Sequence, residues 1–450
     1  MASTDLLLSS PTAGDRQKGT ISVWVKRTAV SSNGYLYSTW NTGEGGYSSG
    51  LLQFATDNTL VLTNYQASGG AHTELKTTRT FMDTNAWYHV CINWDTTLAS
   101  SGDRYKMFIN GVRETVFNTE TYPSSDENLF FDIGGTSNPI RIGSVQGSSA
   151  YYDGLMSHYH KIDGTAYDAS TFGETDSSTG EWKIKTNPTV SYGSGSGNFF
   201  ILKNNATYTD QSGEGNNLTL GGGTITNTED NPSDIFSTFN SLANYYEQGT
   251  YAYGNTQITT GGSNLYTWNN STLGMEAGKY YAEFKWVSGG SDILFGITDK
   301  YTTSATGELG NYDQQWAYRT NGTVRNNNGD LGGWSGDTWT TGDVISVALD
   351  MTNSKLYFGK NGTWQNSGDP TSGSTGTGAV SISLTPQDGC YYFASCAYDD
   401  NSCVLQANFG NGYFGTTQIS SEGTNASNIG KFEYNVPTGY SALSTKGLNL

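Results

Sequence analysis

Two segments of the sequence share one alternating pattern, and this pattern restricts the fold more than any other feature. From Trp87 to Val112, WYHVCINWDTTLASSGDRYKMFINGV, two runs alternate apolar and polar residues around a polar stretch. From Asp343 to Trp364, DVISVALDMTNSKLYFGKNGTW repeats the arrangement. Period-two alternation predicts β-strands, and Asn-Gly readily adopts the positive φ of a tight turn. The chain therefore reads as two all-β units built on similar hairpins.

The composition supports many short strands joined by turns. The 450 residues include 58 Gly, 30 Tyr and 11 Trp, and only 14% are charged, which favours an all-β class with few helices. We expect two antiparallel, jelly-roll-like β-sandwich domains at 1–187 and 241–450. A Gly/Ser/Asn-rich connector with one or two strands is predicted at 188–240. The stretch 234–246 is the one moderate helix candidate.

The net charge restricts the partners. The chain has 23 Lys+Arg and 41 Asp+Glu, a net charge of −18, which argues against sequence-independent binding to nucleic acid or to an anionic bilayer. No apolar run is long enough for membrane insertion, and Leu6-Leu7-Leu8 is too short for a signal peptide. A neutral or cationic partner fits better.

Three of the four cysteines lie close together in the sequence, at Cys390, Cys396 and Cys403. If Asp399-Asp400 forms a turn, Cys396 and Cys403 oppose each other across a hairpin, and a disulfide is geometrically possible. Without an export signal, reduced and buried thiols are favoured.

Several short motifs resemble known families in their order along the chain. Residues 18 to 185 resemble the laminin-G or concanavalin A-like sandwich, on the motifs ISVWVKR, WYHV, FING, Ile142-Gly143 and Asp153-Gly154. The second unit resembles a SPRY-type sandwich, on GKYYAEFKWV, FGI, GDVISVALDM, LYFGKNG and NFG.

The combination, with IDGTAYDASTFGETDSSTGEW and VPTGYSAL, resembles structural proteins of tailed phages, particularly those from aquatic environments. This resemblance implies a virion fibre, spike or decoration subunit that contacts other virion proteins and a host-surface receptor. It also implies a homo-oligomer, with trimers common among such fibres, although the sequence has no heptad segment to specify one. The first sandwich begins close to Met1, so attachment would use the sandwiches or the C-terminal tail.

Catalytic patterns are weak. Gly46-Tyr47-Ser48-Ser49-Gly50 matches a nucleophile elbow, but the elbow needs a strand-turn-helix context that an all-β chain does not offer. His158 and His160 could share one side of a strand and hold a metal, yet satisfied or exposed histidines are favoured. Glu174 and Asp176 have the spacing of paired glycosidase carboxylates, but they lie in a Gly/Ser/Thr-rich loop. We therefore expect no enzymatic activity.

The loop DQSGEGNN has two interpretations. Asp210, the Ser212 hydroxyl and Asn216 offer hard oxygen ligands for Ca²⁺, and laminin-G-like sandwiches often carry a similar stretch. Asp and Gly are also what a tight turn demands. The turn is favoured, and calcium stays open.

Aromatic residues in polar surroundings are the more suggestive feature. Sugars stack their C–H face on an aromatic ring, while amide and hydroxyl groups satisfy the sugar hydroxyls. The glycan-binding candidates are Tyr35, Tyr37, Trp40 and Tyr47 in the first unit and Trp316, Trp334 and Trp339 in the second. The alternative for each ring is that it caps a sandwich core.

These observations predict a non-enzymatic phage virion protein, made in the host cytoplasm, that binds host-surface glycans or other surface receptors. Two alternatives remain. One is a purely structural subunit that contacts only neighbouring virion proteins, and the other is a polysaccharide depolymerase.

Overall fold

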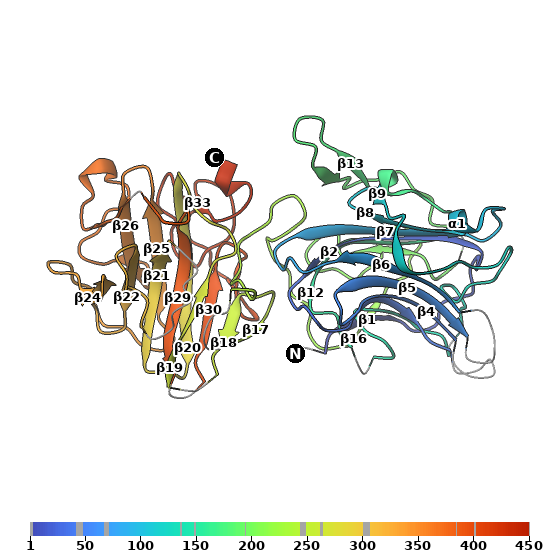
Figure 1. Cartoon of the computed structure of the whole chain (residues 1–450), viewed down its shortest axis with the longest axis horizontal. Helices are drawn as coiled ribbons and strands as arrows, with labels where there is room; N and C mark the ends of the chain where they lie inside the picture. Colours follow the sequence, from blue (N-terminus) through green and yellow to red (C-terminus); the bar gives the residue numbers. More distant parts are fainter. Residues whose placement is uncertain are drawn as a thin grey trace. The chain divides into compact units, whose positions relative to one another are not determined.

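The computed structural model describes residues 3–41, 48–66, 72–135, 137–147, 150–193, 195–243, 249–261, 264–299, 307–383, 385–399 and 402–449. These residues form two units, Met1–Asn227 and Thr228–Leu450. Each unit is built from antiparallel sheets (Figure 1), which confirms the all-β, two-sandwich prediction. No helix in the described part is long and apolar enough to cross a membrane.

The first unit pairs an eight-stranded with a six-stranded sheet. The larger has the order β10-β6-β5-β4-β3-β11-β1-β16, formed by β1 (Asp5–Leu8), β3 (Gly34–Thr39), β4 (Ser48–Phe54), β5 (Thr59–Gln66), β6 (Thr73–Thr80), β10 (Phe117–Thr121), β11 (Ile140–Ile142) and β16 (Thr219–Gly222). The smaller has the order β15-β12-β2-β7-β8-β9, formed by β2 (Lys18–Arg27), β7 (Trp87–Asp95), β8 (Tyr105–Ile109), β9 (Val112–Arg113), β12 (Gly154–Asp163) and β15 (Phe199–Ile201). The remaining elements are a small sheet, β13 (Gly173–Thr175) and β14 (Trp182–Ile184), with α1 (Ser101–Arg104) and the 3-10 turn η1 (Ala169–Thr171).

The second unit also pairs two large sheets. The nine-stranded sheet runs β17-β18-β30-β20-β25-β26-β27, with β28 on β26 and β33 on β20; it comprises β17 (Thr250–Ala252), β18 (Gln257–Thr259), β20 (Lys279–Ser288), β25 (Val344–Asp350), β26 (Lys355–Lys360), β27 (Thr363–Trp364), β28 (Val380–Ser381), β30 (Val404–Asn408) and β33 (Ser441–Ala442). The six-stranded sheet runs β19-β29-β21-β22-β23-β24, from β19 (Leu265–Asn270), β21 (Asp292–Thr298), β22 (Gln315–Arg319), β23 (Val324–Asn326), β24 (Gly329–Asp330) and β29 (Tyr392–Asp399). Smaller elements are β31 (Tyr413–Phe414), β32 (Thr417–Gln418), η2 (Gly373–Thr375) and η3 (Gly447–Asn449).

The repeated hairpin forms as predicted in both units. In β7 and β8 the core residues are Val90, Ile92, Trp94, Tyr105, Met107 and Ile109. In β25 and β26 they are Ile345, Val347, Leu349, Leu356 and Phe358. Period-two alternation thus placed each apolar face correctly.

The Asn-Gly pair makes the same turn in each unit. Asn110 and Gly111 have φ of 49° and 79°, and Asn361 and Gly362 have φ of 47° and 80°. The Asn110 side chain accepts the His89 backbone N–H at 2.7 Å. The Asn361 side chain accepts that of Val344 at 2.9 Å. Each asparagine therefore ties the turn back to the first strand of its hairpin.

The expected connector at 188–240 is wrong. Within it, β15 pairs with β12, and β16 pairs with β1 at the edge of the eight-stranded sheet. The boundary instead falls after Asn227. The one or two strands expected there are present as β15 and β16, but the turn-rich composition did not indicate that they pair with distant strands of the first sandwich.

Two smaller expectations also fail. The described part of the helix candidate, 234–243, is not helical; Phe236 and Phe239 form isolated bridges to Ser444 and Ser271. Cys396 and Cys403 do not oppose each other across a hairpin, because β29 and β30 belong to different sheets. Both cysteines are buried and neither forms a disulfide, as favoured from the sequence.

Candidate functional site

In each sandwich a later segment of the chain covers the outer side of one sheet. In the first unit the outer side of the β2–β7 sheet carries the cluster Cys91, Phe108, Ile162, Ala169, Phe172, Tyr192 and Phe200. In the second, the β20–β25 sheet is covered through Phe236, Tyr281, Ala348, Tyr357, Phe432, Val436, Tyr440 and Ala442. In the second unit the outer side of the six-stranded sheet also carries a buried cluster, formed by Trp268, Leu294, Leu309, Ala317, Ala394 and Cys396. A ligand can therefore reach strand side chains mainly on the outer face of the eight-stranded sheet of the first unit, where Tyr35, Leu51 and Gln53 are partly exposed.

On the first unit's open face, the strand register brings two sequence-predicted rings together. Tyr35 on β3 pairs with Gln53 on β4, which pairs with Val61 on β5. Ser38 pairs with Leu51, which pairs with Thr63. By the alternation of the strand, Tyr35, Ser38 and Trp40 share this outer side across a bulge, and directly paired residues lie on one face.

We call this surface the Tyr35–Trp40 face; it consists of Tyr35, Ser38, Trp40, Leu51, Gln53 and Thr63. Tyr35 and Trp40 are partly exposed, and the strand rise separates them by about 15 Å. Between them, Leu51 and the Gln53 amide are partly exposed, whereas the hydroxyls of Ser38 and Thr63 are buried and that of Ser38 donates to the Ser144 carbonyl. A long, shallow platform with a ring towards each end suits an extended polar ligand.

The electrostatics of this face are mild. Burial raises the pKa of Tyr35, which also hydrogen-bonds the Gln53 side chain, so the phenol stays neutral. Lys76, beside the face, pairs with Asp57 at 2.7 Å and lowers the pKa of that carboxyl to about 2. Glu74 follows Thr63 in the same row and lies 3.5 Å from His72. Along these described rows Glu74 is the single acid, so they hold no carboxylate pair for glycoside cleavage.

Four of the predicted glycan-binding rings are buried in the cores. Tyr37 is 0% exposed, Trp316 5%, Trp334 7% and Trp339 4%. Tyr37 and Trp316 lie on strands and point inwards, while Trp334 and Trp339 fold back from a loop onto Tyr318. These predictions are wrong because a buried ring offers no face to a sugar. Tyr47 lies outside the described residues.

The Asp210 loop is organised by its own hydrogen bonds. One carboxylate oxygen of Asp210 accepts the N–H groups of Phe200 and Ser212, both at 2.9 Å. The other accepts the Ser212 hydroxyl at 2.8 Å and the Asn216 N–H at 2.9 Å. The Asn216 amide donates to Asn198. The carboxylate therefore acts as the acceptor of a turn, which supports the turn interpretation over calcium.

The other weak patterns are structural. His160 stacks on Phe200, with ring centroids 4.0 Å apart, and hydrogen-bonds Tyr192, while burial lowers the pKa of His158 to about 4. Glu174 and Asp176 pair with Lys185 and Lys183 instead of facing each other. Across the described ranges no group of three His, Cys, Asp or Glu could hold a metal. Of the nucleophile-elbow pattern, Gly46 and Tyr47 lie outside those ranges, and Ser48 begins β4.

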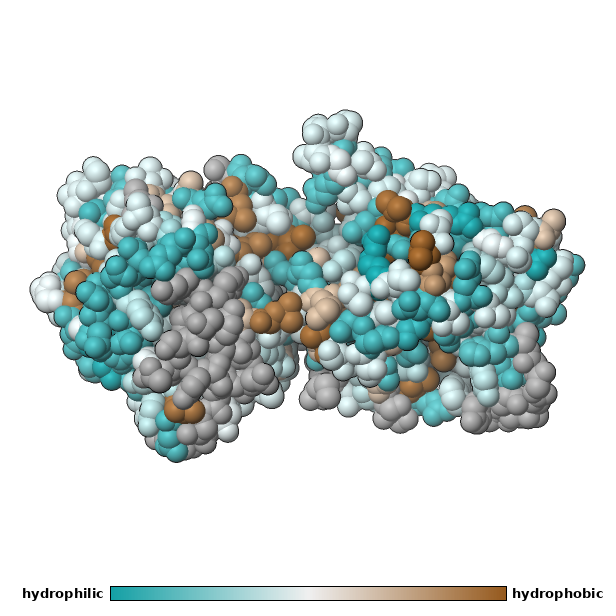
Figure 2. Space-filling view, viewed as in Figure 1, coloured by the Kyte–Doolittle hydropathy of each residue, from teal (hydrophilic) through white to brown (hydrophobic). Residues whose placement is uncertain are grey.

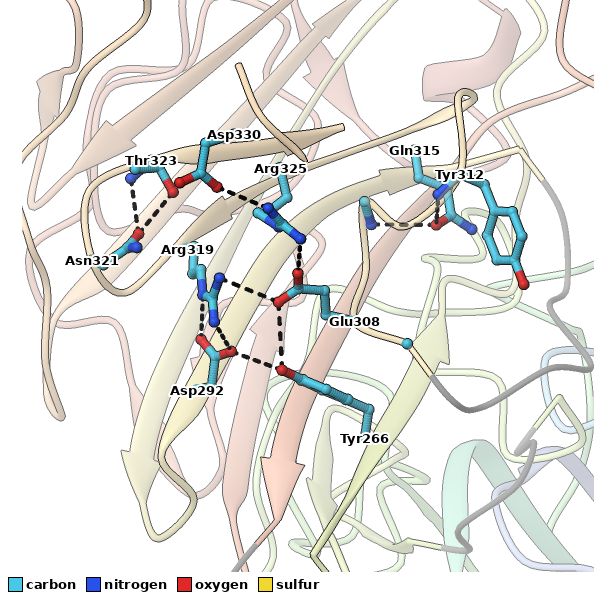
Figure 3. Close-up of polar contacts among 12 residues, drawn as sticks. Tyr266, Asp292, Glu308, Tyr312, Gln315, Arg319, Asn321, Thr323, Arg325 and Asp330 are labelled. Carbon is cyan, nitrogen blue, oxygen red and sulfur yellow. Dashed lines mark hydrogen bonds and ion pairs between the residues drawn. The ribbon is translucent and has the colours of Figure 1, made fainter. Parts of the chain in front are cut away.

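A polar cluster that sequence reasoning missed lies on the outer side of the six-stranded sheet of the second unit (Figure 3), beside the buried cluster that contains Leu294 and Leu309. Arg319 on β22 binds Asp292 on β21 through two hydrogen bonds, at 2.7 and 2.5 Å. The Tyr266 hydroxyl on β19 donates to Asp292 at 2.9 Å. Glu308 contacts Tyr266, Arg319 and Arg325, and Arg325 also contacts Asp330 at 3.1 Å.

No local signal in the sequence could have found this cluster. Tyr266 and Asp292 are 26 residues apart, and Asp292 and Arg319 are 27 residues apart. Only the β19-β29-β21-β22 register brings the three together. On the first unit's face, the sequence identified Tyr35 and Trp40 but not Gln53 or Thr63, because the alternation of β4 and β5 resembles that of any strand.

Comparison with known proteins finds one family match, which lies within the first unit. The family described as the concanavalin A-like lectin/glucanases superfamily matches residues 2–165. Residues 2–165 are thus similar to concanavalin A-like sandwiches, in agreement with the two packed antiparallel sheets of the first unit. That superfamily includes both lectins and glucanases, so the fold indicates a ligand-binding sandwich without deciding between binding and cleavage.

Solved structures show low-level likeness. The SPRY domain of human HERC1 is 18% identical, covers 38% of this chain and 96% of its own, and has a TM-score of 0.31. Another human SPRY domain is 16% identical, with coverage of 34% and 90% and a TM-score of 0.27. A heptameric SAP-like pentraxin from Limulus polyphemus is 17% identical, with coverage of 36% and 71% and a TM-score of 0.27. No curated protein matches the chain.

Proposed function

We propose that this chain is a non-enzymatic carbohydrate-binding protein whose first sandwich takes sugars on the Tyr35–Trp40 face. The observation that carries the proposal is the pair of partly exposed rings on one face of a lectin-type sandwich, with the partly exposed Gln53 amide between them. Rings provide apolar contact for the C–H side of a sugar, and the amide can hydrogen-bond a sugar hydroxyl. None of the six residues of the face is a carboxylate, and Glu74 is the single acid in the rows that continue it, which favours binding over cleavage.

The proposal places the protein on the virion of a tailed phage, as a fibre, spike or decoration subunit that binds host-surface glycans. Support comes from the motif order of the sequence, in which the two sandwiches are combined as in such proteins. Each site is shallow, so its affinity is expected to be weak. Homo-oligomers contacting other virion proteins would make many weak sites effective, because linked sites raise avidity without new contacts.

A glycan array with the purified chain tests the binding. We expect Tyr35→Ala and Trp40→Ala each to weaken binding of the positive glycans about tenfold, which corresponds to losing one aromatic contact. The matched control is Tyr253→Ala, which removes an equally large ring that is 45% exposed in the second unit. The control should bind like the unchanged protein.

Two results would contradict the proposal. If no glycan binds, the subunit is structural and contacts only its neighbours. If reducing ends are released from host polysaccharide, and Glu74→Gln abolishes that release, the protein is a depolymerase.

A further inference from the structure

The first sandwich encloses an amine and a carboxyl group in its core. Lys161 on β12 donates to Asp132 Oδ2 at 2.5 Å, and the two side chains are 0% and 1% exposed, whereas hydrophilic residues are otherwise spread over the surface (Figure 2). Lys161 pairs with the core residues Ile21 and Phe199. Its nitrogen lies over the Trp94 ring, 5.2 Å from the centroid. The two reactive groups are thus held together in apolar surroundings.

As an ion pair, both groups lack hydrogen bonds that they could make. An ammonium has three donors, and each carboxylate oxygen has two acceptor positions. Among the described residues, Lys161 donates to Asp132 alone, and Asp132 Oδ1 is buried with no partner. Charges withdrawn from water often gain less from their attraction than they lose in hydration. An amide between the two side chains has no charge, one donor and one acceptor, so it suits this core better than two ions do.

The geometry also favours the reaction that forms such an amide. A nitrogen hydrogen-bonded to a carboxylate oxygen lies about 3–3.5 Å from the carboxyl carbon, the separation from which bonds form. Groups held in this way react as if one of them were present at about 10⁵ M or more. Burial and the negative charge of Asp163 raise the pKa of Asp132 to about 6. Asp132 therefore takes up a proton more readily than an exposed carboxylate, and the protonated form is the one that an amine attacks.

A third side chain is placed to move protons. Asp163 lies two residues after Lys161 on β12, so both side chains leave the strand on the same side. Asp163 Oδ1 accepts the Asp15 N–H at 2.7 Å, which leaves Oδ2 to carry a proton. A Cβ at Gly197 would lie 2.5 Å from Asp132 Oδ1. The glycine therefore leaves the Asp132 carboxyl group room to turn as it reacts.

We propose that Lys161 and Asp132 condense into an intramolecular isopeptide bond, with Asp163 as the proton carrier. Lys161 gives a proton to Asp132, which leaves a neutral amine and a neutral carboxyl group. Lys161 Nζ then bonds to Asp132 Cγ. Asp163 takes a proton from the nitrogen and passes it to the departing hydroxyl, so the C–O bond breaks. The products are one amide and one water molecule, and atoms and charges balance without an oxidant.

The bond would join two parts of the first sandwich and does not depend on sugar binding. Asp132 lies in the segment that leads to β11 in the eight-stranded sheet, whereas Lys161 belongs to the six-stranded sheet. A covalent link between these parts restricts the unfolded chain and so resists unfolding. The ion pair titrates, and the amide does not.

Mass spectrometry of the purified full chain tests the bond. After incubation until the mass is constant, we expect the main species to be lighter than the sequence mass by one water molecule. After trypsin, fragment 114–141 with Asp132 should be joined to fragment 142–183 with Lys161, because trypsin does not cut after an acylated lysine. Ring closure at an Asp-Gly pair such as Asp163-Gly164 also loses water, but it joins no fragments.

Three variants identify the reacting groups. Asp132→Asn should form the same bond with loss of ammonia instead of water. Lys161→Met should keep its full sequence mass, whereas the matched control Lys183→Met should lose water like the unchanged protein. Asp163→Asn should form joined fragments about a hundredfold more slowly, measured over time after refolding from denaturant.

The outcomes that would overturn the proposal are equally direct. One is an unchanged protein that melts cooperatively and keeps its full sequence mass. Another is a loss of water that persists in Lys161→Met. Equal rates in Asp163→Asn and the unchanged protein would overturn the role given to Asp163.

Discussion

The two sandwiches share a hairpin and a covered sheet, yet they bury different ionisable groups. In the first unit, Lys161 and Asp132 form a buried ion pair on the core side, where Lys161 lies over the Trp94 ring, and His89 and His160 are enclosed by aromatic rings. In the second, Glu283 on β20 is buried without a cation and accepts four hydrogen bonds. All four histidines of the chain lie before residue 161. Similar architecture therefore does not imply similar responses to mutation or pH.

The two covers are also attached differently. The first is held by ring contacts, in which Trp182 stacks on His89 with centroids 5.9 Å apart and donates to it at 3.0 Å. The second also packs through rings, such as Phe432 on Tyr281 with centroids 4.9 Å apart, but it adds a buried carboxylate, because Glu283 accepts the N–H groups of Glu433 and Tyr434 at 2.9 and 2.8 Å. The contrast teaches that a cover can combine ring packing with hydrogen bonds to a neutral imidazole in one unit and to a carboxyl group in the other.

The mutation with the largest expected effect tests the buried ion pair between Lys161 and Asp132. Lys161→Met removes the cation and leaves Asp132 buried and uncompensated. We expect the free energy of unfolding of the first unit to fall by about 4 kcal/mol at pH 7.5, measured by calorimetry on the full chain. The second unit should melt unchanged.

Lys183→Met is the matched control, since Lys183 pairs with Asp176 at 2.7 Å on the surface. It should have little effect, because exposed ion pairs contribute little. Adding Asp132→Leu to Lys161→Met should restore part of the loss. Equal effects of Lys161→Met and Lys183→Met would contradict a special role for the buried pair.

The next effect is a pair of opposite pH dependences. Burial lowers the pKa of His89 to about 3 and that of His160 well below its usual range. Burial raises the pKa of Glu283 to about 7 and that of Asp132 to about 6. A lowered histidine pKa contributes stability that is complete above pH 6.5 and is lost as pH falls. A raised carboxyl pKa contributes stability that is complete below its unfolded value and is lost as pH rises through the folded value.

Between pH 7.5 and pH 5 the first unit should therefore lose about 4 kcal/mol from His89, His160 and the less buried His158, after the smaller gain from Asp132 is subtracted. The second unit should gain about 2 kcal/mol from Glu283 over the same interval. Calorimetric scans at half-unit pH steps measure both. Two transitions that move in the same direction would contradict the assignment.

A third prediction concerns the hydrogen bonds by which Glu283 holds residues 433–434. In Glu283→Gln one backbone N–H of residues 433–434 loses its acceptor, because the amide nitrogen cannot accept. We expect the second unit to lose about 2 kcal/mol and its pH response to flatten. Glu422→Gln, at an exposed position, is the control. Limited proteolysis should cut near residue 430 faster in Glu283→Gln. An unchanged rate of cleavage would contradict the claim that Glu283 holds residues 433–434 in place.

The smallest expected effect comes from the Asp210 turn, which we compare with the hydrogen bonds of Glu283. Asp210 also accepts four hydrogen bonds, but it is only partly buried, so Asp210→Ala should cost about 1 kcal/mol in the first unit. Chelation with EDTA should leave the melting temperature of the unchanged protein the same. A drop on chelation that Asp210→Ala abolishes would establish calcium at Asp210, Ser212 and Asn216.

Much of the framework was predictable because strand alternation directly records which side faces the core. Tyr280, Ala282 and Phe284 were expected to point inwards on β20, and all three are buried there. The cover could not be predicted, because Tyr281 and Glu283 alternate as an outward face should, yet both are fully buried beneath the C-terminal segment.

The candidate sites were only partly predictable. Trp334 and Trp339 lie among glycines and polar residues, which indicates a loop but not the direction of the ring. Cys396 and Cys403 looked like hairpin partners because no local pattern marks a crossing between sheets. The polar contacts among Tyr266, Asp292, Glu308 and Arg319 depend on the order of the strands in a sheet, and no local sequence pattern indicates that order.

The parallel pairing of β20 with β33 also governs how the second unit is completed during synthesis. Tyr280 pairs with Ser441, and Glu283 waits for partners about 150 residues later. Until those residues are synthesised, the central strand β20 exposes Tyr281, and the Glu283 carboxylate lacks the two backbone N–H donors that it has in the folded unit. Such distant pairing slows folding and leaves intermediates open to aggregation. The first unit can close once residue 222 is made, so a growing chain carries one finished sandwich beside one unfinished.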